Sequence, residues 1–318
     1  MQAEEIVGSR LTNQSLSRWL HSLPGVDKVG LEARAASLAT RSIKTTSKVW
    51  GLDMAIKMMD LTTLEGMDTP QRVRSLCQKA MTPDMDDPEC PTPAAICVYG
   101  DMVPHAKAAL GKSKIYVAAV ATAFPSGRAS MKVKLQDTKD AVAFGADEID
   151  MVIDRGAFLS GNYLEVFKQI QAVKQACQRP KGKPAHLKVI LETGELQTYD
   201  NIRRASYLAM LAGADFIKTS TGKEAVNATL PVTLVMLRVL RDYHQRTGHW
   251  AGFKPAGGIR TAKQALDWLV LVREELGFDA QQPARFRFGA SGLLTDIERQ
   301  LEHRVTGRYA TAARQPLC

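Results

Sequence analysis

The chain has 318 residues, of which 45% are hydrophobic and 24% charged, and its formal net charge is +9 at pH 7. This length can bury one large core, and barrels of about 250 residues commonly form a single domain. The sequence has no apolar run of the roughly 18 residues that a membrane span needs and no basic start followed by an apolar core, so we expect a cytoplasmic protein, with a nuclear fraction left open.

Residues 1–50 precede the first predicted strand and contain helix-like pieces at 15–20 and 31–43. We interpret them as an N-terminal helical extension that packs on the domain that follows. Residues 51–305 form the predicted catalytic domain, and residues 306–318 form a C-terminal tail.

Short apolar segments alternate with helix-like ones from about residue 54 onward, which is typical of a parallel sheet with crossover helices. The predicted strands cover residues 55–60, 94–99, 115–122, 148–153, 187–192, 215–219, 252–254 and 285–289. Eight such units predict an α/β fold, a single (β/α)₈ TIM barrel. The proline-rich, acidic piece at 83–93 is predicted to be a surface loop.

Two of the intervening helices have clear punctuation. An apolar stripe after Pro231 ends before Gly248, and a second stripe begins after Thr261, a typical N-cap residue, and ends before Gly277. We therefore predict helices between these residues.

Chemistry in such a barrel lies at the carboxyl ends of the strands. Asp60, Cys97, Asp150, Lys218 and Lys254 lie at or near these ends. Asp150 stands inside an apolar run, where an unpaired charge would be costly, so it needs a partner. A structural salt bridge and a proton relay with a lysine both remain open, and the same two interpretations apply to Asp60. Glu192 could orient a lysine or act on a substrate.

Lys218 and Lys254 together suggest a Schiff-base nucleophile and a second cation that tunes it. A free lysine has a pKa of about 10.4, so it needs burial or a neighbouring positive charge to become a neutral amine near pH 7. The alternative is that Lys218 is an ordinary strand-end lysine that reaches solvent.

Glycine-rich turns follow the last three predicted strands. They contain Gly222 with Lys223, Gly257 with Gly258, and the segment from Gly289 to Gly292. Free backbone N–H groups in such turns, together with a following helix start and the Ser291 hydroxyl, favour an anion such as phosphate. The first turn is not a Walker A loop, because Glu224 replaces the required Ser or Thr.

These residues occur in segments that resemble deoxyribose-phosphate aldolase, a family of class I aldolases on a (β/α)₈ barrel. The matching segments are residues 59–64 (MDLTTL), 95–99 (AICVY), 146–150 (ADEID), 188–196 (KVILETGEL), 214–223 (ADFIKTSTGK), 252–258 (GFKPAGG) and 287–291 (RFGAS). The resemblance implies reversible cleavage of 2-deoxy-D-ribose 5-phosphate to D-glyceraldehyde 3-phosphate and acetaldehyde, in the breakdown of deoxyribose phosphate. It implies neither a metal nor an organic cofactor.

The resemblance also assigns roles. Lys218 matches the Schiff-base lysine, Lys254 the lysine that perturbs it, Asp150 the aspartate of the proton relay and Asp60 a second active-site aspartate. The residues matched to substrate and phosphate binding are Lys223, Gly222, Thr221, Gly257, Gly258, Gly289, Ser291 and Cys97. Gly100, Gly156 and Gly292 depart from the bacterial pattern, which affects loop geometry and one phosphate contact.

Other functions remain as alternatives. The lysine pair specifies covalent chemistry better than it specifies a sugar, so another Schiff-base lyase acting on a phosphosugar is possible. The basic charge would also suit an RNA or ribonucleoprotein partner, although the positive residues are scattered and no RNA-binding motif appears. The histidines form no metal-binding pattern, and a homodimer is expected from the resemblance alone.

Overall fold

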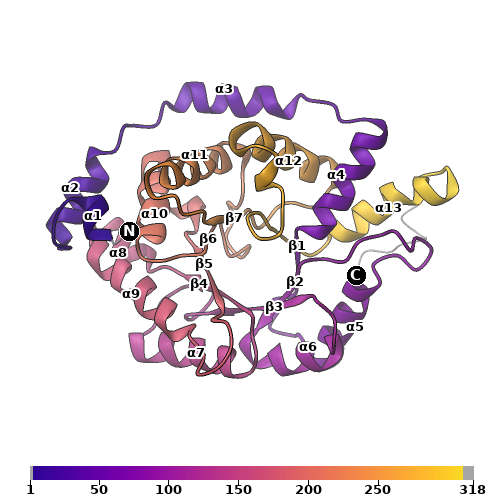
Figure 1. Ribbon diagram of the computed structural model, residues 1–318, viewed down its shortest axis with the longest axis horizontal. Helices are drawn as coiled ribbons and strands as arrows, with labels where there is room; N and C mark the ends of the chain where they lie inside the picture. Colours follow the sequence, from indigo (N-terminus) through magenta and orange to yellow (C-terminus); the bar gives the residue numbers. More distant parts are fainter. Residues whose placement is uncertain (1–2, 311–318) are drawn as a thin grey trace.

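The computed structural model describes residues 3–310, and its centre is a barrel of eight parallel strands (Figure 1). The strands are β1 Met59–Thr62, β2 Ala95–Tyr99, β3 Tyr116–Ala121, β4 Glu148–Val152, β5 His186–Ile190, β6 Phe216–Lys218, β7 Gly252–Lys254 and β8 Phe288–Ala290. Their order in the sheet is β7-β6-β5-β4-β3-β2-β1-β8. Two isolated parallel bridges, Phe253 to Phe286 and Ala256 to Gly289, join the β7 and β8 segments and close the ring. The predicted (β/α)₈ fold is confirmed.

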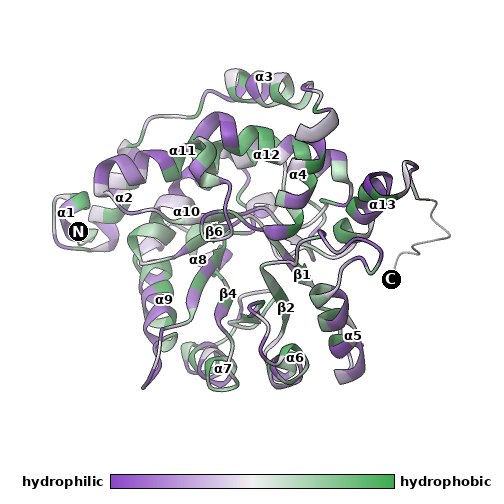
Figure 2. Ribbon diagram, turned by 45° about the vertical axis from the view of Figure 1, so that its right-hand side comes forward, coloured by the Kyte–Doolittle hydropathy of each residue, from purple (hydrophilic) through white to green (hydrophobic). Residues whose placement is uncertain are grey.

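Helices follow the strands and surround them. They are α5 Pro70–Met81, α6 Val103–Leu110, α7 Met131–Ala143, α8 Arg155–Leu159, α9 Tyr163–Ala176, α10 Tyr199–Leu211, α11 Leu230–Thr247, α12 Ala262–Leu276 and α13 Leu293–Thr306. In Figure 2 these helices carry both green and purple residues, as expected of helices with one apolar and one polar face.

The N-terminal segment wraps around part of this outer ring. It contains α1 Ala3–Val7, α2 Asn13–Ser22, α3 Lys28–Ala39 and α4 Thr45–Lys57. Helix α2 lies against α9 and α10, α3 lies against α11 and α12, and α4 lies against α12 and α13 (Figure 1). The segment therefore packs on the helices and not on the strand ends. The division of the chain at residue 50 stays a prediction.

The punctuation of α11 and α12 is as predicted. Thr229 caps α11, Pro231 lies in its first turn, and Gly248 ends it in the left-handed conformation at φ 71°. Thr261 and Gln264 form a capping box at the start of α12, whose C-cap is Gly277. These local signals fix where each helix turns back toward the barrel.

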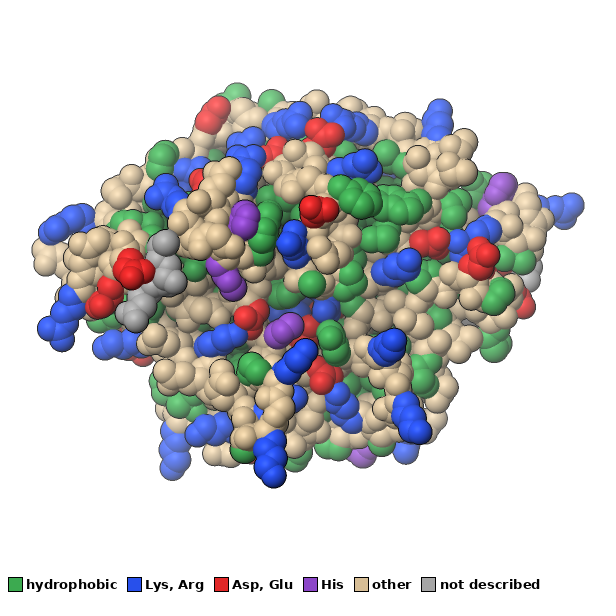
Figure 3. Space-filling view, viewed as in Figure 1, with side chains coloured by type: hydrophobic (Ala, Val, Ile, Leu, Met, Phe, Trp, Pro, Cys, Tyr) green, Lys and Arg blue, Asp and Glu red, His purple; other side chains and the backbone are tan. Residues whose placement is uncertain are grey.

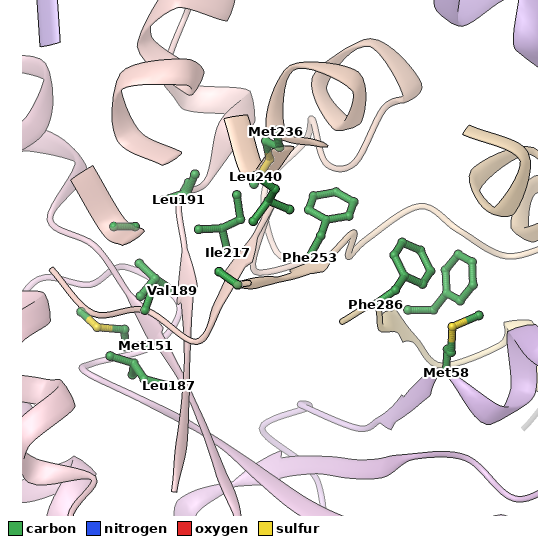
Figure 4. Packing of buried hydrophobic residues seen from close by; sticks show 14 of the residues in the cluster. Met58, Met151, Leu187, Val189, Leu191, Ile217, Met236, Leu240, Phe253 and Phe286 are labelled. Carbon is green, nitrogen blue, oxygen red and sulfur yellow. The ribbon is translucent and has the colours of Figure 1, made fainter. Parts of the chain in front are cut away.

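The strands send alternate side chains to opposite faces. Outward-facing apolar residues pack against the helices; in Figure 4 Ile217 of β6 and Phe253 of β7 lie beside Met236 and Leu240 of α11. The inward-facing residues of the same strands include several charged ones, all buried. An apolar layer outside the barrel thus encloses a charged interior.

Some predicted boundaries are wrong. Residues 55–57, assigned to the first strand, end helix α4 instead, and β1 begins at Met59, so Asp60 lies within β1 and does not end it. A short apolar run gives no periodicity that distinguishes a helix end from a strand. Helix α3 ends at Ala39, short of the predicted residue 43, and β5 ends at Ile190, before Glu192. The predicted surface loop at 83–93 contains no helix or strand.

Basic and acidic side chains are interspersed on the surface. On the face shown in Figure 3, Lys and Arg residues lie over many elements rather than in one tract. Among residues 3–310, no helix combines the length and the apolar character needed to cross a membrane. The predicted tail reaches beyond Ala310 and so lies mostly outside the described residues.

Candidate active site

The two predicted lysines lie side by side on neighbouring strands. Lys218 is the last residue of β6 and Lys254 is the last residue of β7, and the two are direct partners in the strand register. Register partners in a sheet have close, parallel side chains. The local folding of two three-residue strands therefore brings both amino groups to the same point of the barrel interior.

Asp150 connects them. It lies within β4, it is completely buried, and its Oδ2 accepts from the Nζ of Lys218 at 2.8 Å and from the Nζ of Lys254 at 2.8 Å. The partner that the sequence required for Asp150 is thus a pair of lysines. One carboxylate oxygen holds both amino groups in a fixed relation.

Further charged side chains lie behind this triad. Asp60 accepts from Lys254 at 2.5 Å and from Arg287 at 2.7 Å. Lys188 lies 3.2 Å from Asp150 and 3.3 Å from Asp60, and it also donates to Glu148. Glu148 in turn accepts from Arg287 at 2.9 Å. All are at most 2% exposed, so the network is shielded from water.

The balance of positive and negative charges in this network favours a neutral Lys218. It contains the three carboxylates of Asp60, Glu148 and Asp150, and the four basic side chains of Lys188, Lys218, Lys254 and Arg287. Charges balance when one basic group gives up its proton. An uncompensated buried charge is strongly unfavourable, so the group with the fewest carboxylate partners should be the neutral one.

The pKa of Lys218 is lowered from its ordinary value. Burial is the main cause, and the positive charge of Lys254 adds to it, whereas Asp150 opposes both. The neutral amine, which is the nucleophilic form, is therefore favoured at this position.

The pKa of Lys254 moves the other way. Burial disfavours its charged form, but Asp150 and Asp60 together outweigh this and raise the pKa of Lys254. Burial alone would raise the pKa of Asp150, yet Lys188, Lys218 and Lys254 hold it well below the ordinary range. The pKa values of two adjacent lysines thus shift in opposite directions, because Lys254 has two carboxylate partners and Lys218 has one.

A cavity of about 250 Å³ opens above Lys218. Of the seven charged residues in the network, all of which the structure describes, Lys218 alone lines it. The other lining residues come from the carboxyl ends of β1 and β8 and from the turns after β1, β6, β7 and β8: Thr62, Leu64, Glu65, Thr221, Gly222, Lys223, Ala256, Gly257, Gly258, Ile259, Arg260, Gly289, Ala290 and Ser291. A molecule in this cavity would meet the Lys218 amine, the basic side chains of Lys223 and Arg260, and several backbone turns.

Two of these glycines are required by geometry. Gly257 has φ +80°, and a Cβ there would lie 2.5 Å from the side chain of Asn227. A Cβ on Gly289 would lie 2.8 Å from the Cβ of Ala256 and 3.1 Å from the Cε of Lys254. Gly289 therefore leaves room for Lys254 to reach Asp150, in addition to lining the cavity.

The turn after β6 is held by its neighbours. The Thr221 N–H donates to the Glu192 carboxylate at 3.2 Å, and the Lys223 N–H donates to the Thr221 hydroxyl at 3.1 Å. Glu192 lies 3.7 Å from Arg155, so its partners are this turn and an arginine rather than a lysine. Burial raises the pKa of Glu192. Its position suits support of the turn.

The structure brings most of the predicted site residues together. Lys218, Lys254, Asp150 and Asp60 form one bonded group, and Thr221, Gly222, Lys223, Gly257, Gly258, Gly289 and Ser291 line one cavity. Cys97 is buried beside the lysines but does not line the cavity, and burial raises the pKa of its thiol. Its role stays a prediction.

Sequence reasoning assigned no role to Lys188, Glu148, Arg287 or Arg260. A signal existed for two of them, because Glu148 and Lys188 lie in apolar strands where a charge demands a partner. Arg260 directly follows the Gly257 and Gly258 turn, where a basic residue suits an anion. Arg287 precedes β8, and its burial was not apparent from the chain alone.

The three departures from the bacterial pattern lie at or near the starts of helical segments that follow strands. Gly100 begins a short 3₁₀ turn after β2, and Gly292 is the N-cap of α13. Gly156 lies in the first turn of α8, and a Cβ there would meet the end of the exposed Arg128 side chain, at 2.9 Å.

Comparisons with known proteins agree with this geometry. Residues 54–291 match the model of the DeoC/LacD family aldolases. The chain is 50% identical over 283 residues to deoxyribose-phosphate aldolase of Mus musculus, covering 86% of this chain and 87% of that protein, and 48% identical to the Homo sapiens enzyme over the same shares. A solved structure from Toxoplasma gondii, described provisionally as a deoxyribose-phosphate aldolase, superimposes with a TM-score of 0.70 at 26% identity, covering 80% of this chain and 95% of that one.

Proposed function

The chain belongs to the DeoC/LacD family of aldolases. We propose that it reversibly cleaves 2-deoxy-D-ribose 5-phosphate into D-glyceraldehyde 3-phosphate and acetaldehyde through a Schiff base on Lys218. It is a class I aldolase, a carbon–carbon lyase. The reaction would serve the breakdown of deoxyribose phosphate.

One observation carries the assignment of the nucleophile: Lys218 alone, of the charged network, faces the cavity, and its pKa is lowered. A lysine must be neutral to attack a carbonyl carbon, and it must be reachable by the substrate. Lys218 lines the cavity and its lowered pKa favours the neutral form, whereas Lys254 has a raised pKa and does not line the cavity.

The chemical steps follow from this arrangement. The Lys218 amine attacks C1 of the open-chain sugar, and loss of water gives an imine, which withdraws electrons when protonated. The C3 hydroxyl then gives up its proton, the C2–C3 bond breaks, and its electron pair forms the enamine of the two-carbon fragment. Protonation at C2 and hydrolysis release acetaldehyde and restore the Lys218 amine.

Proton transfer in these steps falls to Asp150 and Lys254. Lys254 holds a proton because its pKa is raised, and Asp150, bonded to both lysines, keeps its charge. A water molecule in the cavity would carry protons between this pair and the substrate, since neither side chain lines the cavity. Asp60 holds Lys254 in place from the far side at 2.5 Å.

The substrate phosphate would bind at the other end of the cavity. Lys223 and Arg260 supply positive charge, and the Gly257 and Gly258 turn supplies backbone N–H groups. Helix α13 begins at Leu293, two residues after Ser291, and its N-cap Gly292 has no side chain to satisfy the first N–H groups. An anion there would accept from them.

Borohydride reduction in the presence of acetaldehyde or 2-deoxyribose 5-phosphate, followed by peptide mass mapping, tests the proposal. A reduced adduct on Lys218 is the expected result, and folded, active protein without an adduct would overturn the covalent mechanism. A panel of phosphosugars then separates this substrate from that of another Schiff-base lyase, because the lysine pair does not itself measure chain length.

The oligomeric state, the cellular location and the division of the chain into segments are also proposals. We propose a homodimer and a cytoplasmic location, to be checked by light scattering of the purified protein and by imaging of a tagged copy. The division into a helical extension, a barrel and a tail is proposed on the same footing and can be checked by limited proteolysis.

A further inference from the structure

A second ion pair lies at the entrance of the cavity and has no part in the chemistry described above. The Nζ of Lys223 lies 2.8 Å from the Oε1 of Glu65. Both residues line the cavity, and their side chains are 31% and 54% exposed. The proposed phosphate-binding lysine is thus already paired with a carboxylate.

The pair spans the site. Glu65 follows β1 and Lys223 follows β6, and β8 and β7 lie between these strands in the closed ring. The turns after β7 and β8 carry Gly257, Gly258 and Ser291, which belong to the proposed phosphate-binding site. The Glu65–Lys223 pair therefore bridges the same side of the cavity where an anion would bind.

Hydrogen bonds hold the backbone segments that carry Glu65 and Lys223. The Asp68 carboxylate accepts from the Thr63 hydroxyl at 2.8 Å and from the Glu65 N–H at 3.0 Å, which holds the loop after β1. Lys223 is held through its N–H on Thr221 at 3.1 Å. Only the two long side chains need to rotate for the pair to open, and an exposed ion pair of this kind is weak.

We propose that Glu65 is a specificity-determining residue, a built-in counter-ion that the anionic group of the substrate must displace from Lys223. The inference rests on the proposed function for the identity of that anion. Glu65 lowers the affinity of the site for phosphate esters and for free phosphate, and it receives Lys223 back when the phosphorylated product leaves. An uncharged sugar cannot displace it.

The test is Glu65→Gln, which keeps the shape of the side chain and removes its charge. The KM for 2-deoxyribose 5-phosphate should fall by about two- to fivefold, since Lys223 no longer has a competing partner. The kcat/KM for unphosphorylated 2-deoxyribose should not change. Glu274→Gln is the matched control, because Glu274 pairs with Arg41 and Arg34 away from the cavity and loses the same charge.

A double-mutant cycle separates competition for Lys223 from simple repulsion of the phosphate by Glu65. In a Lys223→Met background the effect of Glu65→Gln should disappear. An effect of equal size in both backgrounds would overturn the exchange, as would a KM that Glu65→Gln leaves unchanged in the wild-type background.

Binding of inorganic phosphate, measured by titration calorimetry on the unreacted protein, makes the inference separable from the proposed reaction. Tighter phosphate binding by Glu65→Gln without any borohydride adduct would overturn the proposed function and leave the counter-ion role standing. An adduct on Lys218 together with unchanged phosphate affinity and unchanged KM would overturn the counter-ion role alone.

Discussion

The interior of the barrel and the layer around it are built from the same strands but from opposite kinds of residue. In β5, Lys188 points inward between Leu187 and Val189, which pack outward. In β6, Lys218 points inward and its neighbour Ile217 packs outward (Figure 4). In these two strands one side places a charged residue in the buried interior, and the other side is hydrocarbon.

The two regions have opposite energetic roles. Burying an aliphatic side chain in the outer layer contributes about 1.5–3 kcal/mol. Burying ions is unfavourable unless each is paired, and even a well-paired buried ion rarely adds net stability. The outer layer therefore stabilises the strands, and the strands hold the interior charges in positions that they would not adopt by themselves.

The largest expected effect comes from removing the group in the interior that faces the cavity. Lys218→Ala should lower kcat/KM by about 10⁴-fold or more, since no other cavity-lining residue offers a neutral amine at this point. The melting temperature should not fall, because the amine that is removed is favoured in its neutral form and Asp150 keeps Lys188 and Lys254 as partners. Steady-state kinetics and a thermal melt measure both, and a variant that keeps substantial turnover would contradict the role of Lys218.

Lys254→Met tests how one interior charge controls another. The positive charge of Lys254 lowers the pKa of Lys218, and Lys254 also shares the Asp150 oxygen. Without Lys254 the pKa of Lys218 should rise, so less neutral amine is present near pH 7. The pH at which kcat/KM reaches half its maximum should therefore move upward, and kcat should fall by about 10²- to 10⁴-fold through loss of the proton donor.

The control for this shift is Lys107→Met. Lys107 is paired with Asp147 at 2.5 Å on the outside of the barrel, so its loss changes net charge but not the interior. Its pH profile should match that of the wild type. A profile of Lys254→Met that stays in place, or moves to lower pH, would show that Lys254 does not set the pKa of Lys218.

Prediction from sequence worked best where one strand or one turn carries the signal. Lys218, Asp150 and the glycine turns each have an informative local pattern, and Thr261 and Gly277 mark a helix by themselves. Arg287 and Glu65 have no such local pattern. Arg287 contacts Glu148, 139 residues away in the chain, and Glu65 contacts Lys223, 158 residues away. Such contacts depend on the closure of the ring, which brings strand 1 beside strand 8.

Removing Arg287 tests the cost of an unpaired interior charge. Arg287→Met leaves Asp60 and Glu148 without their guanidinium partner, and breaking a buried pair in this way typically costs about 3–5 kcal/mol. Denaturant unfolding should show a loss of that order. Arg273→Met, the same exchange at an exposed arginine that lies over Phe278, should change stability by less than about 0.5 kcal/mol. Equal losses in the two variants would show that removing a buried arginine from the interior network costs no more stability than removing an exposed one.

The smallest effect should come from the outer layer at the position next to the nucleophile. Ile217→Val removes one methylene from a fully buried side chain that packs toward α11, and such a deletion costs about 0.5–1.5 kcal/mol. Because Ile217 points away from the cavity, kcat/KM and its pH profile should stay at wild-type values while the free energy of unfolding falls. If the rate or the pH profile changed as well, the two faces of β6 would be coupled, and the outer layer would tune the Lys218 amine as well as hold its strand in place.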